Sequence, residues 1–462
     1  MTKNMTAGDP ARLIFFFALP LIAGNMMQQL YSFVDTLIVG RFLGVNALAA
    51  VGCTGSLMFL ALGFIMGFCT GITIYTGQRF GADVAHYTIS IIRGRGIDAN
   101  AAGVRRSAAT CILLGMLTAL LLTAFVFPLT RPLLILMETP PEILDGAVDF
   151  LSIIFAGLMV FLLLYLQNCL IRALGDSTTP TVILGITLAI NVVLEPIAIL
   201  VLDLGIPGAA GATVAAQAIG MLVFFLYIRR RIPALCPVWQ DFKPDASLLA
   251  VHLRLGLPMG LQSSVIALGA IILQVALNNL GALPVAAYAA TQKIDAVAVM
   301  PMLSFGYAMA AYTAQNYGAQ QYARIRAGVH ACLKMSAAFA VAIGILLIAF
   351  GTHLLALFVG ADAQGAEEVI AYGQTFLTVN GSTYIILAVL LVYRNVLQGL
   401  GQSVVPTIAG AMELVMRAGA AIFLCAHLGF LGACLANPLA WIGAGIPVVI
   451  AYFWTEKTLR SA

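Results

Sequence analysis

The chain has 462 residues, of which 61% are hydrophobic and only 9% are charged. A soluble globular protein carries about 25% charged residues, so this composition and a mean hydropathy of +1.01 argue against a soluble enzyme or binding domain. The net charge of +4 does not indicate a nucleic-acid partner, because the basic residues lie at the ends of apolar segments.

Apolar segments of about 20 residues, the length that crosses a bilayer as a helix, recur along the whole chain. We therefore predict an all-α integral membrane protein with twelve transmembrane helices. In chain order, the predicted spans lie near 13–39, 48–76, 108–127, 147–170, 181–202, 209–228, 250–278, 283–312, 329–350, 376–398, 404–425 and 431–454.

The first apolar segment is too long for a cleaved signal peptide and has no clear small-residue cleavage site, so we expect an uncleaved first span. Eight cysteines are scattered, mostly within spans and without a CxxC pair. They are expected to be small buried residues rather than metal ligands or disulfide partners. The five histidines show no metal-ligand spacing, and we expect neither a metal site nor a cofactor.

The basic residues indicate topology. If the N-terminus is cytoplasmic, nearly all of them face the cytoplasm, and only Arg41 and Arg131 lie on the opposite side. This is a strong positive-inside bias. We therefore expect a multi-pass protein of the bacterial inner membrane with both termini in the cytoplasm.

The second half of the chain repeats the first. Four stretches recur in the same order, which chance does not readily explain, and six spans per half make the repeats parallel. The matched pairs are FALPLI at 17–22 with LGLPMG at 255–260, TGQRFGA at 76–82 with TAQNYGA at 313–319, LIRALGDSTTP at 170–180 with VLQGLGQSVVP at 396–406, and LGIPGAAGA at 204–212 with LGFLGACLA at 428–436.

The repeat predicts two pseudo-symmetric six-helix bundles, residues 1–228 and 248–462, joined by a polar cytoplasmic linker at 229–247. Two similar bundles are the usual architecture for alternating access. The first half also carries an insertion near 83–102, which contains Gly-Arg-Gly but no full GxGxxG. A short interfacial segment is a better interpretation of it than a nucleotide site.

Ionisable residues within the spans are the strongest functional signal, because a carboxylate at the bilayer centre costs roughly 3 kcal/mol on insertion scales. The first half has Asp35 in the first span and Glu195 in the fifth. Asn191 lies four residues before Glu195 and shares its helix face. Pro196 removes a backbone donor, so the helix is expected to bend there and free carbonyl groups. The structural alternative for each polar residue is a satisfied hydrogen bond.

Other polar residues are weaker candidates. Thr213 and Gln217 share a face of the sixth span, and Tyr31 lies one turn before Asp35. Glu413 and Arg417 are four residues apart, which predicts a structural ion pair. Lys293 and Asp295 cannot form such a pair and fit either another ion pair or the substrate path. The residues predicted for a substrate cavity are Gln28, Tyr31, Gln217, Lys293 and Asp295.

The paired six-span halves resemble the multidrug and toxic compound extrusion (MATE) family. The resemblance covers essentially the whole chain, and its motifs are specific together although each is weak alone. They are YSFVDTLIVGRFLG at 31–44, LQNCLIRALGDSTTP at 166–180, INVVLEPIAIL at 190–200, PGAAGATVAAQ at 207–217 and LRLGLP at 253–258.

The chain is most similar to the bacterial branch with its cation site in the N-terminal half. That resemblance implies a site of Asp35, Asn191, Glu195 and Thr213. Glu195 departs from the usual Asp, which leaves proton and sodium coupling open. The branch with a C-terminal site needs acids where this chain has about Ile266 and Leu387, so that site is expected to be absent.

We therefore expect a cation-coupled antiporter that exports drug-like, cationic amphipathic molecules and works as a monomer. Its partners are expected to be these small molecules and the lipid bilayer, with no nucleic acid. A lipid-linked oligosaccharide flippase of the same superfamily is an alternative, but it would need a strongly cationic cavity. An intramembrane enzyme is a third possibility and would need a nucleophile with a base, which the spans do not reveal.

Overall fold

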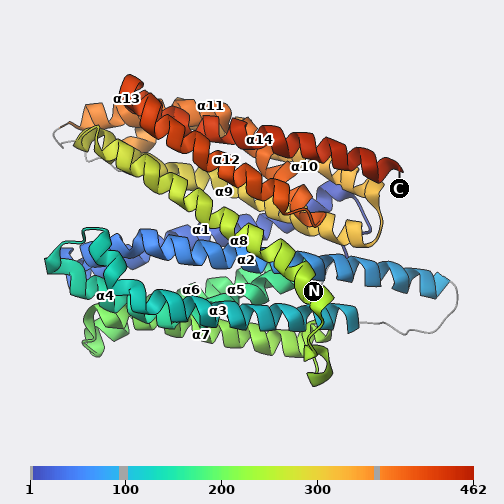
Figure 1. Cartoon of the computed structure of the whole chain (residues 1–462). Helices are drawn as coiled ribbons and strands as arrows, with labels where there is room; N and C mark the ends of the chain where they lie inside the picture. The colour runs from blue at the N-terminus through green and yellow to red at the C-terminus, as the bar shows by residue number, and fades with distance from the viewer. Residues whose placement is uncertain (1–3, 93–101, 358–364, 462) are drawn as a thin grey trace. The chain divides into compact units, whose positions relative to one another are not determined.

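A computed structural model describes residues 4–92, 102–357 and 365–461 of the chain, and all of its regular structure in these ranges is helical. The helices form because long apolar segments in lipid must satisfy every backbone polar group within themselves. In chain order they are α1 (Pro10–Leu43), α2 (Val45–Ile92), α3 (Ala102–Leu136), α4 (Pro141–Ala156), α5 (Leu158–Ala173), α6 (Thr178–Pro196), the π-helical η1 (Ile197–Val201), α7 (Gly205–Arg231), the short η2 (Pro233–Leu235) and η3 (Trp239–Phe242), α8 (Ala246–Asn278), α9 (Ala282–Gly318), α10 (Tyr322–Ala356), α11 (Ala366–Gly399), α12 (Val404–Gly419), the π-helical η4 (Ala420–Leu424), α13 (Cys425–Leu428) and α14 (Phe430–Ser461) (Figure 1).

The number of membrane spans agrees with the sequence prediction. Within the described ranges, eleven helices are long and apolar enough to cross a membrane. The pair α4 and α5, bent by 49° at Gly157, makes a twelfth if it counts as one broken span. A Cβ at Gly157 would lie 2.8 Å from the side chain of Val214 on α7. The bend is therefore at a point where the backbone between α4 and α5 passes close to α7. The all-helical membrane fold class is confirmed, with eleven or twelve candidate spans among the described residues.

The chain divides into two compact units. The N-terminal unit contains Ala23–Gly260, and the C-terminal unit contains Met5–Ile22 with Leu261–Ala462. The continuous helices α1 and α8 each contribute to both units. Each carries a proline near the residue at which the unit changes, Pro20 in α1 and Pro258 in α8. Each proline removes a backbone hydrogen bond there and allows the helix to bend.

Matching irregularities support the internal repeat. Gly175 and Gly401 follow α5 and α11 with φ angles of 86° and 85°. Only glycine adopts this left-handed conformation without a steric cost, which explains why both copies of the motif keep it. Each half also interrupts its next helix with a π-helical segment, η1 after α6 and η4 after α12.

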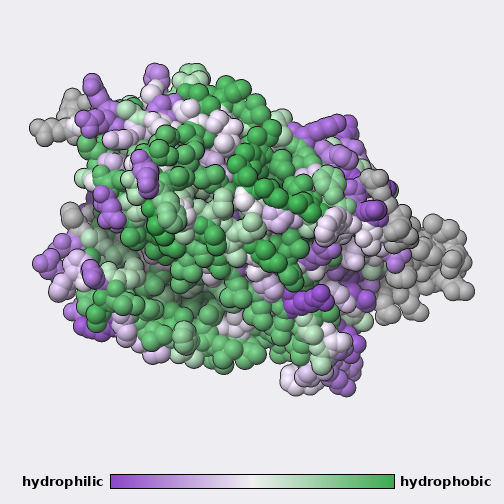
Figure 2. All heavy atoms as spheres, turned by 45° about the horizontal axis from the view of Figure 1, so that its top comes forward, coloured by the Kyte–Doolittle hydropathy of each residue, from purple (hydrophilic) through white to green (hydrophobic). Residues whose placement is uncertain are grey.

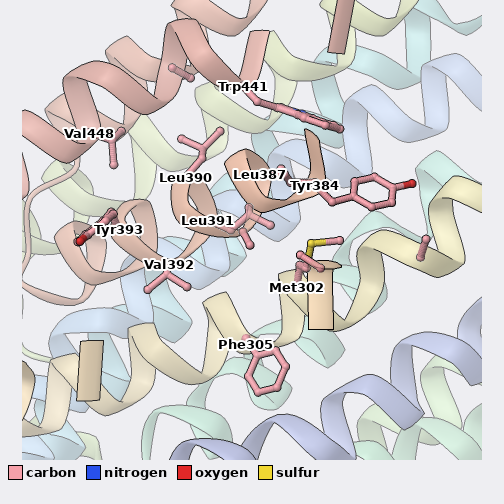
Figure 3. Close-up of a cluster of buried hydrophobic side chains, with 14 of the residues drawn as sticks. Met302, Phe305, Tyr384, Leu387, Leu390, Leu391, Val392, Tyr393, Trp441 and Val448 are labelled. Atoms are coloured by element: carbon pink, nitrogen blue, oxygen red, sulfur yellow. The ribbon is translucent and has the colours of Figure 1, made fainter. Parts of the chain in front are cut away.

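Each unit has its own hydrophobic core. In the C-terminal unit, Met302 and Phe305 of α9, Tyr384 of α11 and Trp441 of α14 belong to one buried cluster (Figure 3). The rings of Tyr384 and Trp441 lie 6.1 Å apart.

Apolar side chains also cover much of the outside, as expected for a surface that contacts lipid. Figure 2 shows broad hydrophobic areas on the visible face. On α3, for example, Leu120, Leu121 and Phe125 are all at least 60% exposed.

The polar linker after α7 is attached to the N-terminal unit. Asp241 of η3 accepts a hydrogen bond from the backbone N–H of Val238 at 2.9 Å. Its carboxylate also lies 3.3 Å from the guanidinium of Arg105 on α3. Residues 93–101, nearly half of the insertion near 83–102, lie outside the described ranges, so the interfacial interpretation stays a prediction.

Candidate cation site in the N-terminal unit

Three helices of the N-terminal unit supply the predicted site residues. Asp35 lies in the last third of α1, Asn191 and Glu195 lie near the end of α6, and Thr213 lies on α7. Helices α6 and α7 pack against each other along their length. Asn191 is 2% exposed and Glu195 is 0% exposed. The shared helix face expected for this pair is therefore turned into the protein.

Hydrogen bonds link the members of this group. The side-chain amide of Asn191 donates to the Thr213 hydroxyl at 3.2 Å. Thr213 in turn donates to the backbone carbonyl of Ala209 at 3.1 Å. On α1, the Tyr31 hydroxyl donates to a carboxylate oxygen of Asp35 at 3.3 Å. The donors of Asn191 and Tyr31 thus have partners within the site.

The acceptors of the site are less well satisfied. Among the described residues, both carboxylate oxygens of Glu195 and the amide oxygen of Asn191 are buried without a hydrogen-bond partner. The Asp35 carboxyl group and the Tyr31 hydroxyl are both within electrostatic range of Glu195. Buried acceptors without donors are costly. A proton or a small metal cation is the species that would satisfy such an oxygen-lined group.

The backbone changes its geometry directly after Glu195. Pro196 ends α6, and residues Ile197–Val201 continue as a π-helix. The expected irregularity at the proline is therefore present, in the form of a wider helical turn. Short π-helical segments inside α-helices occur frequently at functional sites.

Comparisons with known proteins identify the family. The MatE family model matches residues 20–87, 89–197 and 258–423. The chain belongs to the MatE family. It is 26% identical to the probable multidrug resistance protein YoeA of Bacillus subtilis, over 99% of this chain and 97% of that protein. The probable multidrug resistance protein NorM of Thermotoga maritima is 23% identical, over 92% of this chain and 87% of NorM.

Solved structures show the same fold. An outward-facing multidrug resistance MATE family transporter of the MOP superfamily aligns with a TM-score of 0.88 at 21% identity, covering 100% of both chains. The chain therefore shares its multi-helical membrane fold with a MATE transporter of known structure. The resemblance drawn from the sequence motifs is confirmed.

The residues predicted for a substrate cavity have different surroundings in this MatE chain. In the N-terminal unit, Gln28 is exposed, Gln217 is half-buried one turn after Thr213, and Tyr31 takes part in the site through Asp35. In the C-terminal unit, Lys293 is exposed and Asp295 is buried. These five residues remain predictions for the substrate path.

Asp295 has a tyrosine as its partner. The hydroxyl of Tyr384, on α11, donates to the Asp295 carboxylate at 2.5 Å. Sequence spacing could not identify this contact, because the two residues are 89 positions apart.

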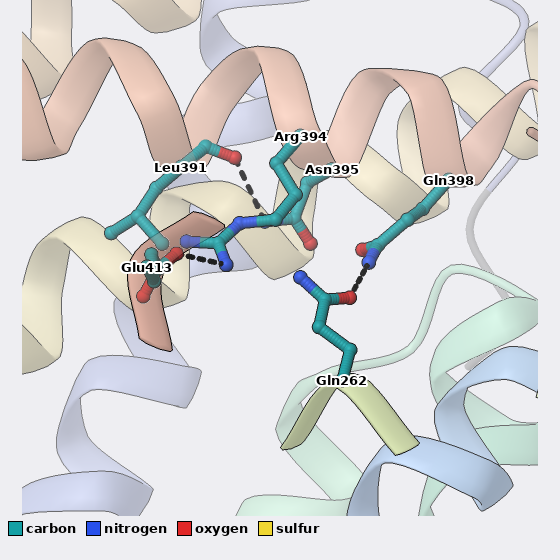
Figure 4. A network of polar contacts seen from close by, with 6 residues as sticks. All are labelled: Gln262, Leu391, Arg394, Asn395, Gln398 and Glu413. Carbon is teal, nitrogen blue, oxygen red and sulfur yellow. Dashed lines mark hydrogen bonds and ion pairs between the residues drawn. The ribbon is translucent and has the colours of Figure 1, made fainter. Parts of the chain in front are cut away.

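The prediction that Glu413 pairs with Arg417 is wrong. Glu413 of α12 pairs with Arg394 of α11, with Nη1 and Oε1 2.8 Å apart (Figure 4). The four-residue spacing of Glu413 and Arg417 allows a pair within one helix. The neighbouring helix α11 instead brings a second arginine to the carboxylate. Arg394, expected at the cytoplasmic membrane surface, is 7% exposed inside the C-terminal unit.

Sequence analysis also missed a buried serine and histidine in the N-terminal unit. The Ser107 hydroxyl on α3 lies 2.9 Å from Nε2 of His252 on α8. His252 Nδ1 lies 2.8 Å from the Leu248 carbonyl and donates to it, because that oxygen can only accept. In the neutral ring Nε2 therefore accepts from Ser107. Both residues are 0% exposed, so this arrangement is closed to a substrate.

Proposed function

We propose that this MatE protein is a cation-coupled antiporter that exports drug-like amphipathic molecules by alternating access. The observation that carries the proposal is the group of buried acceptor oxygens on Asn191 and Glu195 without hydrogen-bond donors. The names of its relatives YoeA and NorM, probable multidrug resistance proteins, support the export of drugs.

In the proposed mechanism, Asp35 and Glu195 hold the driving cation. Two neighbouring carboxylates do not both ionise cheaply, so the pair is expected to exchange a proton or sodium ion as a unit. One charge that moves inward through the membrane field releases about 2.3 kcal/mol per 100 mV. Ion binding neutralises charge beside α1, and we propose that this helix then repacks and drives outward movement of the substrate.

Topology supports the direction of this exchange. We propose that the protein lies in a bacterial inner membrane with both termini in the cytoplasm, as the positive-inside bias indicates. Relatives from Bacillus subtilis and Thermotoga maritima are consistent with a bacterial membrane. Protons or sodium ions would then enter from outside while the substrate leaves.

The alternatives receive less support. A flippase for lipid-linked oligosaccharides would need a strongly cationic surface for pyrophosphate. Of the buried arginines described in the C-terminal unit, Arg394 is neutralised by Glu413, which leaves Arg417 as a single cation. An intramembrane hydrolase would need an accessible nucleophile. The hydroxyl of Ser107 beside His252 is fully buried.

Transport by the purified protein in liposomes tests the proposal. Proton and sodium gradients are imposed separately while the efflux of a panel of cationic dyes is followed. We expect one of the two gradients to drive dye movement in the wild type and not in Asp35→Asn. Gradient-independent dye movement, or equal movement in the variant, would contradict coupling through this site.

A further inference from the structure

Arg417 is a buried charge without a partner among the described residues of the C-terminal unit. Among its described residues, the buried acids and bases are Asp295, Arg394, Glu413 and Arg417. Arg394 and Glu413 neutralise each other in an ion pair. Asp295 accepts from the Tyr384 hydroxyl. Neither carboxylate is therefore left to pair with Arg417.

The Arg417 side chain is buried inside the C-terminal unit. It lies on α12, within a candidate membrane span, and is 7% exposed. Its Nε atom is buried and has no hydrogen-bond partner among the described residues. A guanidinium group cannot lose its charge in a protein, and an unpaired charge inside a membrane protein is costly and usually functional. Arg417 therefore needs an explanation other than packing.

The surroundings of Arg417 suit an acidic group attached to an apolar body. Its side chain lies beside Gly269 of α8, where an added Cβ would be 3.4 Å from Nη1. The hydroxyl of Tyr288 on α9 is within electrostatic range of Arg417. The Tyr288 ring packs edge-on against Phe376 with 5.5 Å between centroids. The guanidinium and the Tyr288 hydroxyl thus supply hydrogen-bond donors, and the Tyr288 ring, which is 6% exposed, supplies the adjacent apolar group.

We propose that Arg417 binds the acidic group, a carboxylate or a phosphate, of an amphipathic substrate. The proposal rests on the export function proposed above and names a substrate class for it. The planar guanidinium binds such groups through two parallel hydrogen bonds. The unpartnered groups of the N-terminal unit, at Glu195, are acceptors suited to a cation. The unpartnered group of the C-terminal unit is a donor suited to an anion.

Binding to the purified full-length protein, measured without any ion gradient, tests this assignment. The probes are a xanthene dye with a free carboxylate, the methyl ester of the same dye, and dodecyl phosphate. Arg417→Met should weaken binding of the acid dye by roughly tenfold or more, the loss expected for a charge-assisted hydrogen bond. The ester should change by less than about twofold, and Arg417→Lys should be intermediate for the acid.

A matched control and a stability measurement separate binding from folding. Lys334→Met removes an exposed cation of the same unit and should leave binding of both dyes unchanged. Arg417→Met should raise the thermal unfolding midpoint, because it removes a buried charge that has no partner. A lowered midpoint would show that Arg417 is a structural residue, and equal losses for acid and ester would also overturn the proposal.

The remaining outcomes distinguish the source of the acidic group. Binding of both the acid dye and dodecyl phosphate through Arg417 supports a general site for acidic amphipaths. Binding of dodecyl phosphate alone would assign Arg417 to a lipid headgroup and overturn its role for exported substrates. The acid dye could bind through Arg417 although neither a proton nor a sodium gradient drives the efflux of any dye. In that case the antiporter proposal fails, while the assignment of Arg417 as a binding residue stands.

Discussion

Arg394 and Glu413 form a buried ion pair between α11 and α12, with 2.8 Å between Nη1 and Oε1. Both side chains are less than 10% exposed, at 9% and 4%. The surrounding network in Figure 4 includes Gln398 of α11, whose amide donates to Gln262 of α8 at 3.1 Å. These contacts tie three helices of the C-terminal unit together through buried polar groups.

The first prediction concerns this pair. Glu413→Gln leaves the Arg394 charge buried without a counter-ion, which should cost roughly 3 kcal/mol of stability. Thermal unfolding in detergent measures the change. The double variant Arg394→Met with Glu413→Leu is the control and should recover most of the loss, because apolar residues replace a buried pair well. A Glu413→Gln protein as stable as wild type would contradict the prediction.

The second prediction concerns coupling. Glu195→Gln is nearly isosteric and mimics the protonated side chain, so it should abolish gradient-driven dye efflux while the protein remains folded. Glu195→Asp should keep partial activity, since a carboxylate stays at the position. The measurement is dye efflux against external pH, with spin-label distances across α1 to detect its repacking. A wild-type pH response in Glu195→Gln would assign this glutamate a structural role.

The third prediction concerns the hydrogen bond from Asn191 to Thr213. Thr213→Val keeps the shape of the side chain but removes the hydroxyl that accepts from Asn191. A hydrogen bond of this kind contributes about 1 kcal/mol, which corresponds to about a fivefold weaker affinity for the driving ion. Thr213→Ser retains the hydroxyl and should behave like wild type. Ion-concentration dependence of efflux distinguishes the two variants, and equal behaviour would count against a role for Thr213.

The fourth prediction concerns the buried pair of Ser107 and His252. Ser107→Ala leaves Nε2 of His252 without a hydrogen bond and should lower stability by about 1–3 kcal/mol. Thr110→Ala on the same helix removes only a bond to the preceding turn and should have a much smaller effect. Gradient-driven efflux should survive in both variants. Loss of efflux in a folded Ser107→Ala protein would contradict this prediction and indicate that the pair takes part in transport.

The fifth prediction concerns the contact of α2 with α8 inside the N-terminal unit. A Cβ at Gly71 would lie 2.6 Å from the Leu255 carbonyl oxygen and 2.7 Å from Cα of Gly256. Gly71→Ala must therefore push two backbones apart and should cost roughly 1–3 kcal/mol. Gly63 on the same helix has open space around its Cβ position, so Gly63→Ala should be tolerated. Comparable unfolding midpoints for the two variants would show that α2 and α8 can move apart here at little cost in stability.

The sequence by itself determined the candidate membrane spans and the acids of the candidate cation site. Span positions follow from uninterrupted apolar length, which is a local property of the chain. Asp35 and Glu195 were conspicuous because carboxylates inside apolar segments are costly, and the four-residue spacing added Asn191. Thr213 came from the family resemblance, and the structure adds its hydrogen bond with Asn191.

Only the tertiary structure decided which buried groups meet and which are left alone. The partner of Glu413 is Arg394 on another helix rather than Arg417 on its own, because helix packing places residues of distant sequence side by side. The contact of Ser107 with His252 spans 145 positions for the same reason. Whether a polar atom lacks a partner depends on every neighbour at once. The unpartnered oxygens of Glu195 and the unpartnered Nε of Arg417 therefore became visible only when the helices were packed.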